Sequence, residues 1–223
     1  MAETLAEALA NIRNILADKP VKLIAVSKQA TCKQMEEAFS LGVTEFGENR
    51  VQDALKKRVE LSPALVRSAH WHFIGHLQTN KVKQVVGNFD LIHSVDSLRL
   101  AREISQQAES KGLVQKILLQ VKVLPDPSKS GFTPESLKES LNEILCLNSI
   151  SVEGLMTICP ASPDPSIWRQ CFKGLGDLKI ELENSHQIKL KELSMGMTDD
   201  WNEAIAYGAT MIRIGRALFD RSA

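Results

Sequence analysis

The chain has 223 residues and a mass of 24.7 kDa, which suits one large domain or two small ones at about 100–200 residues per domain. Its composition, 43% hydrophobic and 24% charged, is that of an ordinary globular protein and excludes disorder, collagen and coiled coil. The 27 basic side chains equal the 27 acidic ones, so no net charge attracts a polyanion or an anionic membrane. We therefore expect no nucleic-acid partner and no membrane partner.

The cysteines and the hydropathy pattern predict a reducing compartment. The four cysteines are widely spaced, form no CxxC motif and lie in otherwise apolar segments: Cys32, Cys146, Cys159 and Cys171. We expect them to be reduced core residues. Charges interrupt the apolar positions of the first 19 residues, unlike in a signal peptide. No run reaches the roughly 18 apolar residues of a membrane helix, so we expect a soluble, cytoplasmic protein.

Along the chain, strand and helix patterns alternate. Apolar residues at helical spacing predict a first amphipathic helix that ends before Pro20. Eight short apolar runs then predict strands at residues 21–27, 44–48, 70–75, 90–95, 116–123, 151–158, 190–195 and 210–215. Helical patterns lie between them at residues 32–40, 49–61, 79–87, 97–110, 134–147, 166–184 and 198–208. Predicted helix caps are Thr31, Ser97 and Thr133, and predicted helix ends lie near Gly42, Gly87, Gly112 and Gly208.

This alternation, without hairpin dipeptides, predicts parallel βαβ units in an α/β fold. Closure into a single (β/α)8 TIM barrel with an extra N-terminal helix is the natural arrangement, although 223 residues is compact for a fold that typically takes about 250. The alternative is an open doubly wound sheet, but the first turn, SKQATCKQ, has no glycine-rich fingerprint. No linker interrupts the pattern, so residues 1–223 are predicted to be one domain. The longest irregular segment, residues 123–134, should be a loop on the C-terminal face of the barrel.

Lys28 is the first candidate for chemistry, because it follows the apolar first strand. An ammonium there must either leave the low-dielectric region or lose its proton, since desolvation lowers the pKa of a lysine. A neutral amine at a barrel mouth forms Schiff bases with carbonyl compounds. The alternative is a solvated lysine that opens the first loop.

A second candidate follows the seventh predicted strand, in the sequence SMGMTDDW. Ser194, Gly196 and Thr198 form a small-residue turn that leads into a helix, which suits an anion such as phosphate. A further glycine turn, Gly215-Arg216, follows the eighth strand, and these two loops are the recurrent phosphate site of such barrels. The alternative for the first turn is an ordinary connection with Thr198 as helix cap.

Arg213 is the third candidate, because its neighbours in the last strand are apolar. A buried arginine usually pairs with an acid or faces a ligand. The structural alternative is an ion pair with one of the strand-end carboxylates, which are Glu45, Glu48 and Glu192. A lysine at the first strand and an anion pocket at the last two together suggest a phosphorylated carbonyl ligand.

Six stretches also resemble a known family. They are residues 25–28 (AVSK), 46–52 (FGENRVQ), 72–81 (HFIGHLQTNK), 154–158 (GLMTI), 193–200 (LSMGMTDD) and 212–216 (IRIGR). Together they resemble the YggS/PROSC family of pyridoxal-phosphate-binding homeostasis proteins, which includes cyanobacterial members. The resemblance runs from the first helix to the C-terminus. One departure is Asp220, where the family pattern would have glycine.

The resemblance implies an alanine racemase-like barrel that carries pyridoxal 5'-phosphate (PLP) as an internal aldimine on Lys28. It implies further that a set of residues surrounds the phosphate, namely Ser194, Gly196, Thr198, Gly215 and Arg216. It places Asn49 beside the cofactor ring and Arg213 at the pyridine nitrogen. Because arginine stays protonated, a ring nitrogen that faces it remains unprotonated, and the cofactor is a poorer electron sink.

The first functional hypothesis is therefore a protein that holds and delivers PLP in vitamin B6 and amino-acid homeostasis, without turning over a substrate. A low-efficiency PLP-dependent racemase is the alternative, and the resemblance implies that its second base would be a tyrosine from another domain. The single tyrosine here, Tyr207, lies in a predicted helix and is expected to pack. A Schiff-base aldolase without PLP is the third hypothesis.

The remaining polar candidates are weaker. His76 follows a strand but is expected to be a packed, hydrogen-bonded structural residue. The other barrel histidines have no partners at metal-ligand spacing, so we expect no metal. Lys129 in the long loop is expected to be solvated. The protein is expected to be a monomer that contacts PLP-requiring enzymes or a regulatory protein transiently.

Overall fold

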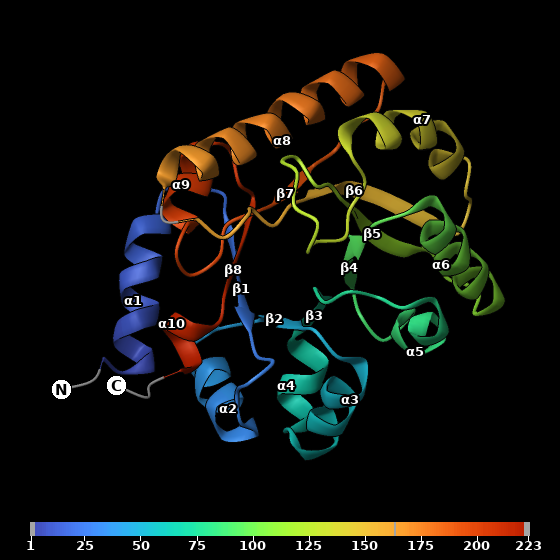
Figure 1. Ribbon diagram of the computed structural model, residues 1–223. Coiled ribbons are helices and arrows are strands. Elements are labelled where there is room, and N and C mark those ends of the chain that lie inside the picture. Colours follow the sequence, from blue (N-terminus) through green and yellow to red (C-terminus); the bar gives the residue numbers. More distant parts are fainter. Residues whose placement is uncertain (1–2, 163, 221–223) are drawn as a thin grey trace.

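Eight parallel strands form a closed barrel in the computed structural model, which describes residues 3–162 and 164–220 (Figure 1). Each strand pairs with the next in chain order, and β8 pairs with β1. The strands are β1 Lys22–Val26, β2 Glu45–Glu48, β3 His70–Phe73, β4 Leu91–Val95, β5 Gln115–Gln120, β6 Ile150–Met156, β7 Glu192–Ser194 and β8 Met211–Ile214. The predicted (β/α)8 barrel is confirmed. The open-sheet alternative is wrong, because the β1–β8 pairing leaves no free edge between these strands.

Helices cover the outside of the barrel (Figure 1). They are α1 Leu5–Leu16, α2 Cys32–Ser40, α3 Val51–Glu60, α4 Pro63–Ser68, the 3-10 helix Thr79–Lys81, α5 Val82–Val85, α6 Leu98–Ser110, α7 Pro134–Leu145, α8 Pro165–His186, α9 Trp201–Ala206 and α10 Arg216–Phe219. The N-terminal helix α1 lies against the last helix, α10. The chain therefore brings its first and last helices together beside the junction of β1 and β8.

The predicted helix boundaries follow local chemistry. Thr31, Ser97 and Thr133 each cap a helix, accepting a hydrogen bond from the backbone N–H three residues later. The predicted helix ends at Gly42, Gly87, Gly112 and Gly208 all have positive φ, which glycine adopts without strain. Two short helices, α4 and α10, were not predicted. The helix expected from residue 198 begins only at Trp201, with Asp200 at its N-cap, so Thr198 as the cap is wrong.

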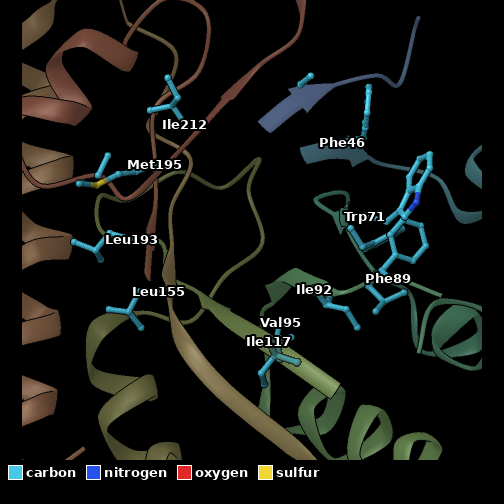
Figure 2. Close-up of a cluster of buried hydrophobic side chains, with 14 of the residues drawn as sticks. Phe46, Trp71, Phe89, Ile92, Val95, Ile117, Leu155, Leu193, Met195 and Ile212 are labelled. Carbon is cyan, nitrogen blue, oxygen red and sulfur yellow. The ribbon is translucent and has the colours of Figure 1, made fainter. Parts of the chain in front are cut away.

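Most of the hydrophobic core lies between the strands and the surrounding helices. Figure 2 shows members of this layer from several strands, among them Phe46, Ile92, Leu155 and Ile212. A second, smaller cluster contains Ile24, Leu91, Leu118, Met156 and Met211. The strands also bury polar side chains, which are Glu48, His72, His93, Ser94, Gln115, Gln120, Ser194 and Arg213. Several of these polar groups determine the geometry of the site.

The prediction that all four cysteines lie in the core is confirmed for two of them and wrong for the other two. Cys159 and Cys171 are buried, as predicted, but Cys146 is exposed and Cys32 is only half-buried. Cys146 caps the C-terminus of α7, which explains its exposure despite its apolar neighbours in sequence. Across the described ranges, no helix combines the length and apolar character needed to span a bilayer.

Candidate functional site

Lys28 and the last glycine turn line one cavity at the C-terminal end of the barrel. The cavity has a volume of about 260 Å³, and its lining includes Lys28, Gly215, Arg216 and Asp220. Strand pairing explains why Lys28 lies near the Gly215-Arg216 turn, since Ala25 of β1 pairs with Ile214 of β8. Parallel strands end on the same face of a barrel, so the residues that follow β1 and β8 become neighbours. The amine and the glycine turn, far apart in sequence, therefore share one space.

The Lys28 side chain is exposed, at the rim of this cavity. Of the two positions open to a lysine at the end of an apolar strand, Lys28 has the solvated one, because its side chain leaves the low-dielectric interior. The run of buried residues that begins in β1 ends at Ser27, one residue before Lys28. An exposed amine at a cavity rim is accessible to a carbonyl compound from solvent.

A buried network fixes the turn beneath Lys28. Ser27 Oγ donates to Glu48 Oε1 at 2.7 Å, and Lys57 Nζ donates to the same oxygen at 2.8 Å and to the Ser27 carbonyl at 2.5 Å. Glu48 is fully buried, and Lys57 reaches it from α3. This ion pair joins the ends of β1 and β2 immediately before the amine. The sequence does not indicate this ion pair, because Lys57 is one of several charged residues in a helix that is expected to be solvated.

Asn49 follows β2, next to the end of β1. Its backbone packs directly against Gly75, where an added Cβ would lie 2.2 Å from the Asn49 carbonyl oxygen. Only glycine permits this approach. The half-buried Asn49 is thereby held at the mouth of the barrel, directly after the strand that pairs with β1.

The turn after β7 is built by glycine and aspartate. Gly196 has a φ of +92°, and an added Cβ would lie 2.7 Å from Ala204 Cβ of α9. Asp200 Oδ1 accepts from the Met197 N–H at 2.6 Å and so closes the turn. Burial raises the pKa of Asp200, although this hydrogen bond and Arg213 oppose the shift. Gly196 is thus needed for the close packing of α9; its proximity to a phosphate stays a prediction, as does that of Thr198.

Arg216 links the two predicted phosphate turns. Its guanidinium donates to Asp199 Oδ2 at 2.5 Å, joining the start of α10 to the β7–α9 turn. Both side chains are about two-thirds exposed, at 64% and 67%. Arg216 also lines a second cavity of about 600 Å³ with Lys129, Trp168 and Met197. The arginine therefore stands between two cavities, in a position to contact an anion from either.

Arg213 lies inside the barrel with its guanidinium held by neutral groups. Nη1 donates to Ser194 Oγ at 2.7 Å and Nη2 to the Thr157 carbonyl at 2.9 Å. Burial lowers its pKa to about 10, while Asp200 acts in the opposite direction. The guanidinium therefore remains charged at neutral pH.

The predicted alternative for Arg213, an ion pair with a strand-end carboxylate, is not what the described residues show. Glu45 contacts His72, Glu48 contacts Lys57, and Glu192 contacts Lys22. All three carboxylates are thus engaged elsewhere. A buried, charged arginine that is bound only through neutral oxygens is suited to face a ligand.

Ser194 lies beneath the turn rather than on its surface. Its fully buried hydroxyl contacts both Arg213 Nη1 and His93 Nδ1, the latter at 2.9 Å. Both contacts point into the barrel. The expectation that Ser194 surrounds a phosphate stays a prediction, and the contacts that the structure shows are with Arg213 and His93.

Two other predictions about single residues need correction. His76 is not packed: its side chain is 59% exposed, and it contacts Asp96 at 3.2 Å and Ser130 at 3.3 Å. Its hydrogen bonding is confirmed. Lys129 is not simply solvated, since it donates to the carbonyls of Ile158 and Cys159. It thereby ties the long loop after β5 to the segment that follows β6.

His93 gives the folded protein a specific pH dependence. Burial lowers its pKa well below the ordinary value of 6.5, with His72, Arg213 and Lys22 adding to the effect. Below pH 6.5 the unfolded chain binds a proton at this residue that the folded chain does not. The contribution of the neutral His93 to the free energy of unfolding is therefore fully present above that pH. As the pH falls below it, the free energy of unfolding decreases by up to about 1.4 kcal/mol per pH unit. Urea unfolding between about pH 5.5 and 7.5 should show this slope, and His93→Gln should reduce it. Equal slopes in the two proteins would contradict the assignment.

Comparison with known proteins decides the family. The sequence profile of the alanine racemase N-terminal domain matches residues 2–222. The pyridoxal phosphate homeostasis protein of Synechocystis sp. (strain ATCC 27184 / PCC 6803 / Kazusa) is 43% identical over 207 residues, covering 92% of this chain and 94% of that protein. The protein of the same name from Aquifex aeolicus is 42% identical over 198 residues, covering 89% and 86%. The chain belongs to the pyridoxal phosphate homeostasis protein family.

Solved structures agree with membership of the pyridoxal phosphate homeostasis family. PipY from Synechococcus elongatus PCC7942, solved with PLP bound, has a TM-score of 0.91 and 40% identity, covering 97% of this chain and 100% of that one. Alanine racemase from Clostridium difficile 630 has a TM-score of 0.79 at 17% identity and covers 96% of this chain. This chain matches 56% of the racemase chain, and at that identity the likeness shows the fold alone.

Proposed function

We propose that the chain binds PLP, holds it covalently through the ε-amine of Lys28, and acts in vitamin B6 and amino-acid homeostasis rather than turning over a substrate. One observation carries the proposal: the Lys28 amine, Gly215 and Arg216 line a single cavity. The relative PipY, solved with PLP bound, aligns with 97% of this chain. Formation of the link joins the amine nitrogen to the aldehyde carbon and releases one water.

The chemistry of the donor set fits this cofactor. The Lys28 amine suits the aldehyde, and the Arg216 guanidinium suits the phosphate dianion. An added Cβ at Gly215 would lie 3.2 Å from Val26 Cβ, so there is little room for a side chain where β8 ends beside β1. The Arg216–Asp199 pair is exposed, and such pairs contribute only about 0–1 kcal/mol. A phosphate can therefore replace Asp199 as the partner of Arg216 at small cost.

The position of Arg213 favours a protein that holds PLP over one that turns over a substrate. In the proposed arrangement it faces the pyridine nitrogen, and a guanidinium offers only donors. The cofactor, when bound, supplies an electron sink whose strength depends on protonation of that nitrogen. Because Arg213 stays charged, with a pKa of about 10, it cannot take a proton from the ring. It holds the nitrogen as an unprotonated acceptor, and carbanion formation is disfavoured.

The tyrosine also argues against racemisation. Tyr207 is the single tyrosine of the sequence, and it packs half-buried against the hydrophobic core at the end of α9. This position, packed against the core at the end of α9, does not suit the second base that a racemase of this type would need. We further propose that residues 1–223 form one PLP-binding domain, and that the protein is a cytoplasmic monomer that contacts PLP-requiring enzymes or a regulatory protein transiently.

A transfer experiment tests the proposed function. Protein loaded with PLP and freed of excess cofactor is mixed with a cofactor-free PLP enzyme, and recovery of that enzyme's activity is followed beside racemisation of L- and D-alanine. We expect transfer without racemisation. Steady racemisation that disappears in Lys28→Ala would favour the racemase alternative. A colourless protein that forms a reducible adduct with a sugar phosphate would favour the aldolase.

A further inference from the structure

A continuous line of hydrogen bonds crosses the barrel from β2 to β8. Glu45 Oε2 contacts His72 Nε2 at 2.6 Å, and His72 Nδ1 contacts His93 Nε2 at 2.9 Å. His93 Nδ1 then contacts Ser194 Oγ at 2.9 Å, and Ser194 Oγ accepts from Arg213 Nη1 at 2.7 Å. The strands that carry these residues are β2, β3, β4, β7 and β8, on both sides of the barrel (Figure 1). Neither histidine is among the residues that line the cavity of Lys28.

The two ends of this line fix its direction. Arg213 can only donate, and an ionised Glu45 can only accept. The serine hydroxyl must accept from Arg213, and its own proton finds an acceptor at His93 Nδ1. His93 then donates from Nε2 to His72 Nδ1, and His72 donates from Nε2 to Glu45. With both imidazoles neutral, every donor along the line has one acceptor.

Reversal of the line would leave a group without a partner. If His93 carried its proton on Nδ1, Ser194 would accept from both His93 and Arg213, and the serine proton would lose its acceptor. His93 is fully buried and His72 is 3% exposed, so water does not readily replace a missing partner. The Glu45 charge is maintained: burial acts to raise its pKa, but the hydrogen bond from His72, together with the charges of His70 and Lys22, outweighs this and lowers it.

The Glu45 end is open to solvent, on the face of the barrel opposite Lys28. Glu45 and His72 line a cavity of about 300 Å³ at the strand starts, and the Glu45 side chain is 21% exposed. The charged or titratable groups around this end are Lys22 on β1, His70 on β3, Asp90, Lys116 on β5, Glu153 on β6 and Glu192 on β7. The other end is Arg213, so the line joins one face of the barrel to the proposed cofactor contact.

We propose that Glu45, His72 and His93 are positioning residues for Arg213, acting through Ser194 to hold the guanidinium as a donor toward PLP. The proposal rests on the proposed function, which places Arg213 at the pyridine nitrogen. The carboxylate sets the tautomer of each histidine, and the histidines orient the serine hydroxyl that binds Nη1. A carboxylate on one face of the barrel thereby controls the geometry of a cofactor contact near the other.

The substitution that isolates this effect is Glu45→Gln. The amide keeps the shape of the side chain but can either donate to His72 or accept from it, so it no longer dictates a direction. Glu153→Gln is the matched control, since Glu153 lines the same cavity but contacts Ser151 and Lys191 rather than the histidines. Thermal unfolding of both variants verifies that each is folded.

Two measurements test the proposal. Side-chain ¹⁵N NMR of the PLP-free protein should show neutral His72 and His93, each protonated on Nε2. PLP titration, followed by visible absorption, should show binding about threefold to tenfold weaker in Glu45→Gln and unchanged in Glu153→Gln. A His93 proton on Nδ1, or equal affinity in the two variants and the wild type, would overturn the inference. The NMR result does not depend on PLP, whereas failure of the wild type to attach PLP at Lys28 would overturn the proposed function instead.

Discussion

Lys28→Ala is expected to abolish the retention of PLP by the protein. The substitution removes the only covalent attachment that the proposal contains, while Arg216 and Arg213 keep their noncovalent contacts. We expect the visible absorption band of lysine-bound PLP to disappear and the affinity to fall at least about 100-fold, equivalent to about 2.8 kcal/mol. Absorption spectra and equilibrium dialysis of the two proteins measure these effects. Because Lys28 is exposed, its removal should leave the unfolding midpoint nearly unchanged.

Lys33→Ala provides the control for Lys28. Lys33 is also exposed, and it lies on α2, a few residues beyond Lys28 in the chain. It does not belong to the lining of the cavity that Lys28 shares with Arg216. Loss of one positive charge near the site is thus matched in the two variants. If both lost PLP equally, the effect would be electrostatic, and the covalent role of Lys28 would be contradicted.

Gly154→Ala is expected to have the largest effect on stability. Gly154 of β6 pairs with Glu192 of β7, and an added Cβ would lie 1.9 Å from the Glu192 carbonyl oxygen. The obstacle is backbone within a closed barrel, so neither strand can move without breaking its pairing on the other side. We expect a loss of about 3 kcal/mol or more in the free energy of unfolding. Chemical denaturation of the purified variant measures this loss, unless the variant fails to fold.

Gly176→Ala is the matched control for Gly154→Ala. Gly176 lies within α8, where the nearest atom to an added Cβ is the Tyr207 carbonyl oxygen at 3.9 Å. Alanine fits that space and has a higher helix propensity, so we expect a gain of about 0.5–1 kcal/mol. If Gly154→Ala were as harmless as this control, the close approach of β6 and β7 would not constrain the fold as described.

The fold could be predicted because its signals are local. All eight strands arise from short apolar runs, and Thr31, Ser97 and Thr133 cap helices at the expected places. The short elements were harder. The helix α10 has four residues, too few for a periodic pattern. The cap of α9 is Asp200 rather than Thr198 because the Gly196 turn extends by one Asp200–Met197 hydrogen bond.

The site was only partly visible in the sequence. Strand ends identified Lys28 and the Gly215-Arg216 turn, and the structure places them in one cavity. The partners of Arg213 could not be predicted, because they come from β7 and from the residue after β6. The sequence also does not indicate that His72 and His93 contact each other, since it shows only that they lack partners at metal-ligand spacing. Their role depends on which barrel positions face inward together, and this follows from the register of eight strands rather than from spacing in the chain.

Whether the Lys28 amine is buried or exposed could not be predicted from the sequence. The sequence allowed either a desolvated or a solvent-exposed amine, and the turn after Ser27 exposes it. Glu48 and Lys57, paired beneath that turn, hold the strand ends in place. The amine that we propose as the reactive group is thus solvent-accessible and lies on a support held by this ion pair. This arrangement suits a protein that both takes up and gives up its cofactor.

Reduction followed by peptide mapping tests the central claim most directly. The protein is incubated with PLP, reduced with borohydride so that any Schiff base becomes a stable amine, digested and analysed by mass spectrometry. The account predicts one phosphopyridoxyl group, on Lys28, and its absence from Lys28→Ala treated in the same way. A principal adduct on another lysine, or an unmodified Lys28 in protein saturated with PLP, would contradict it.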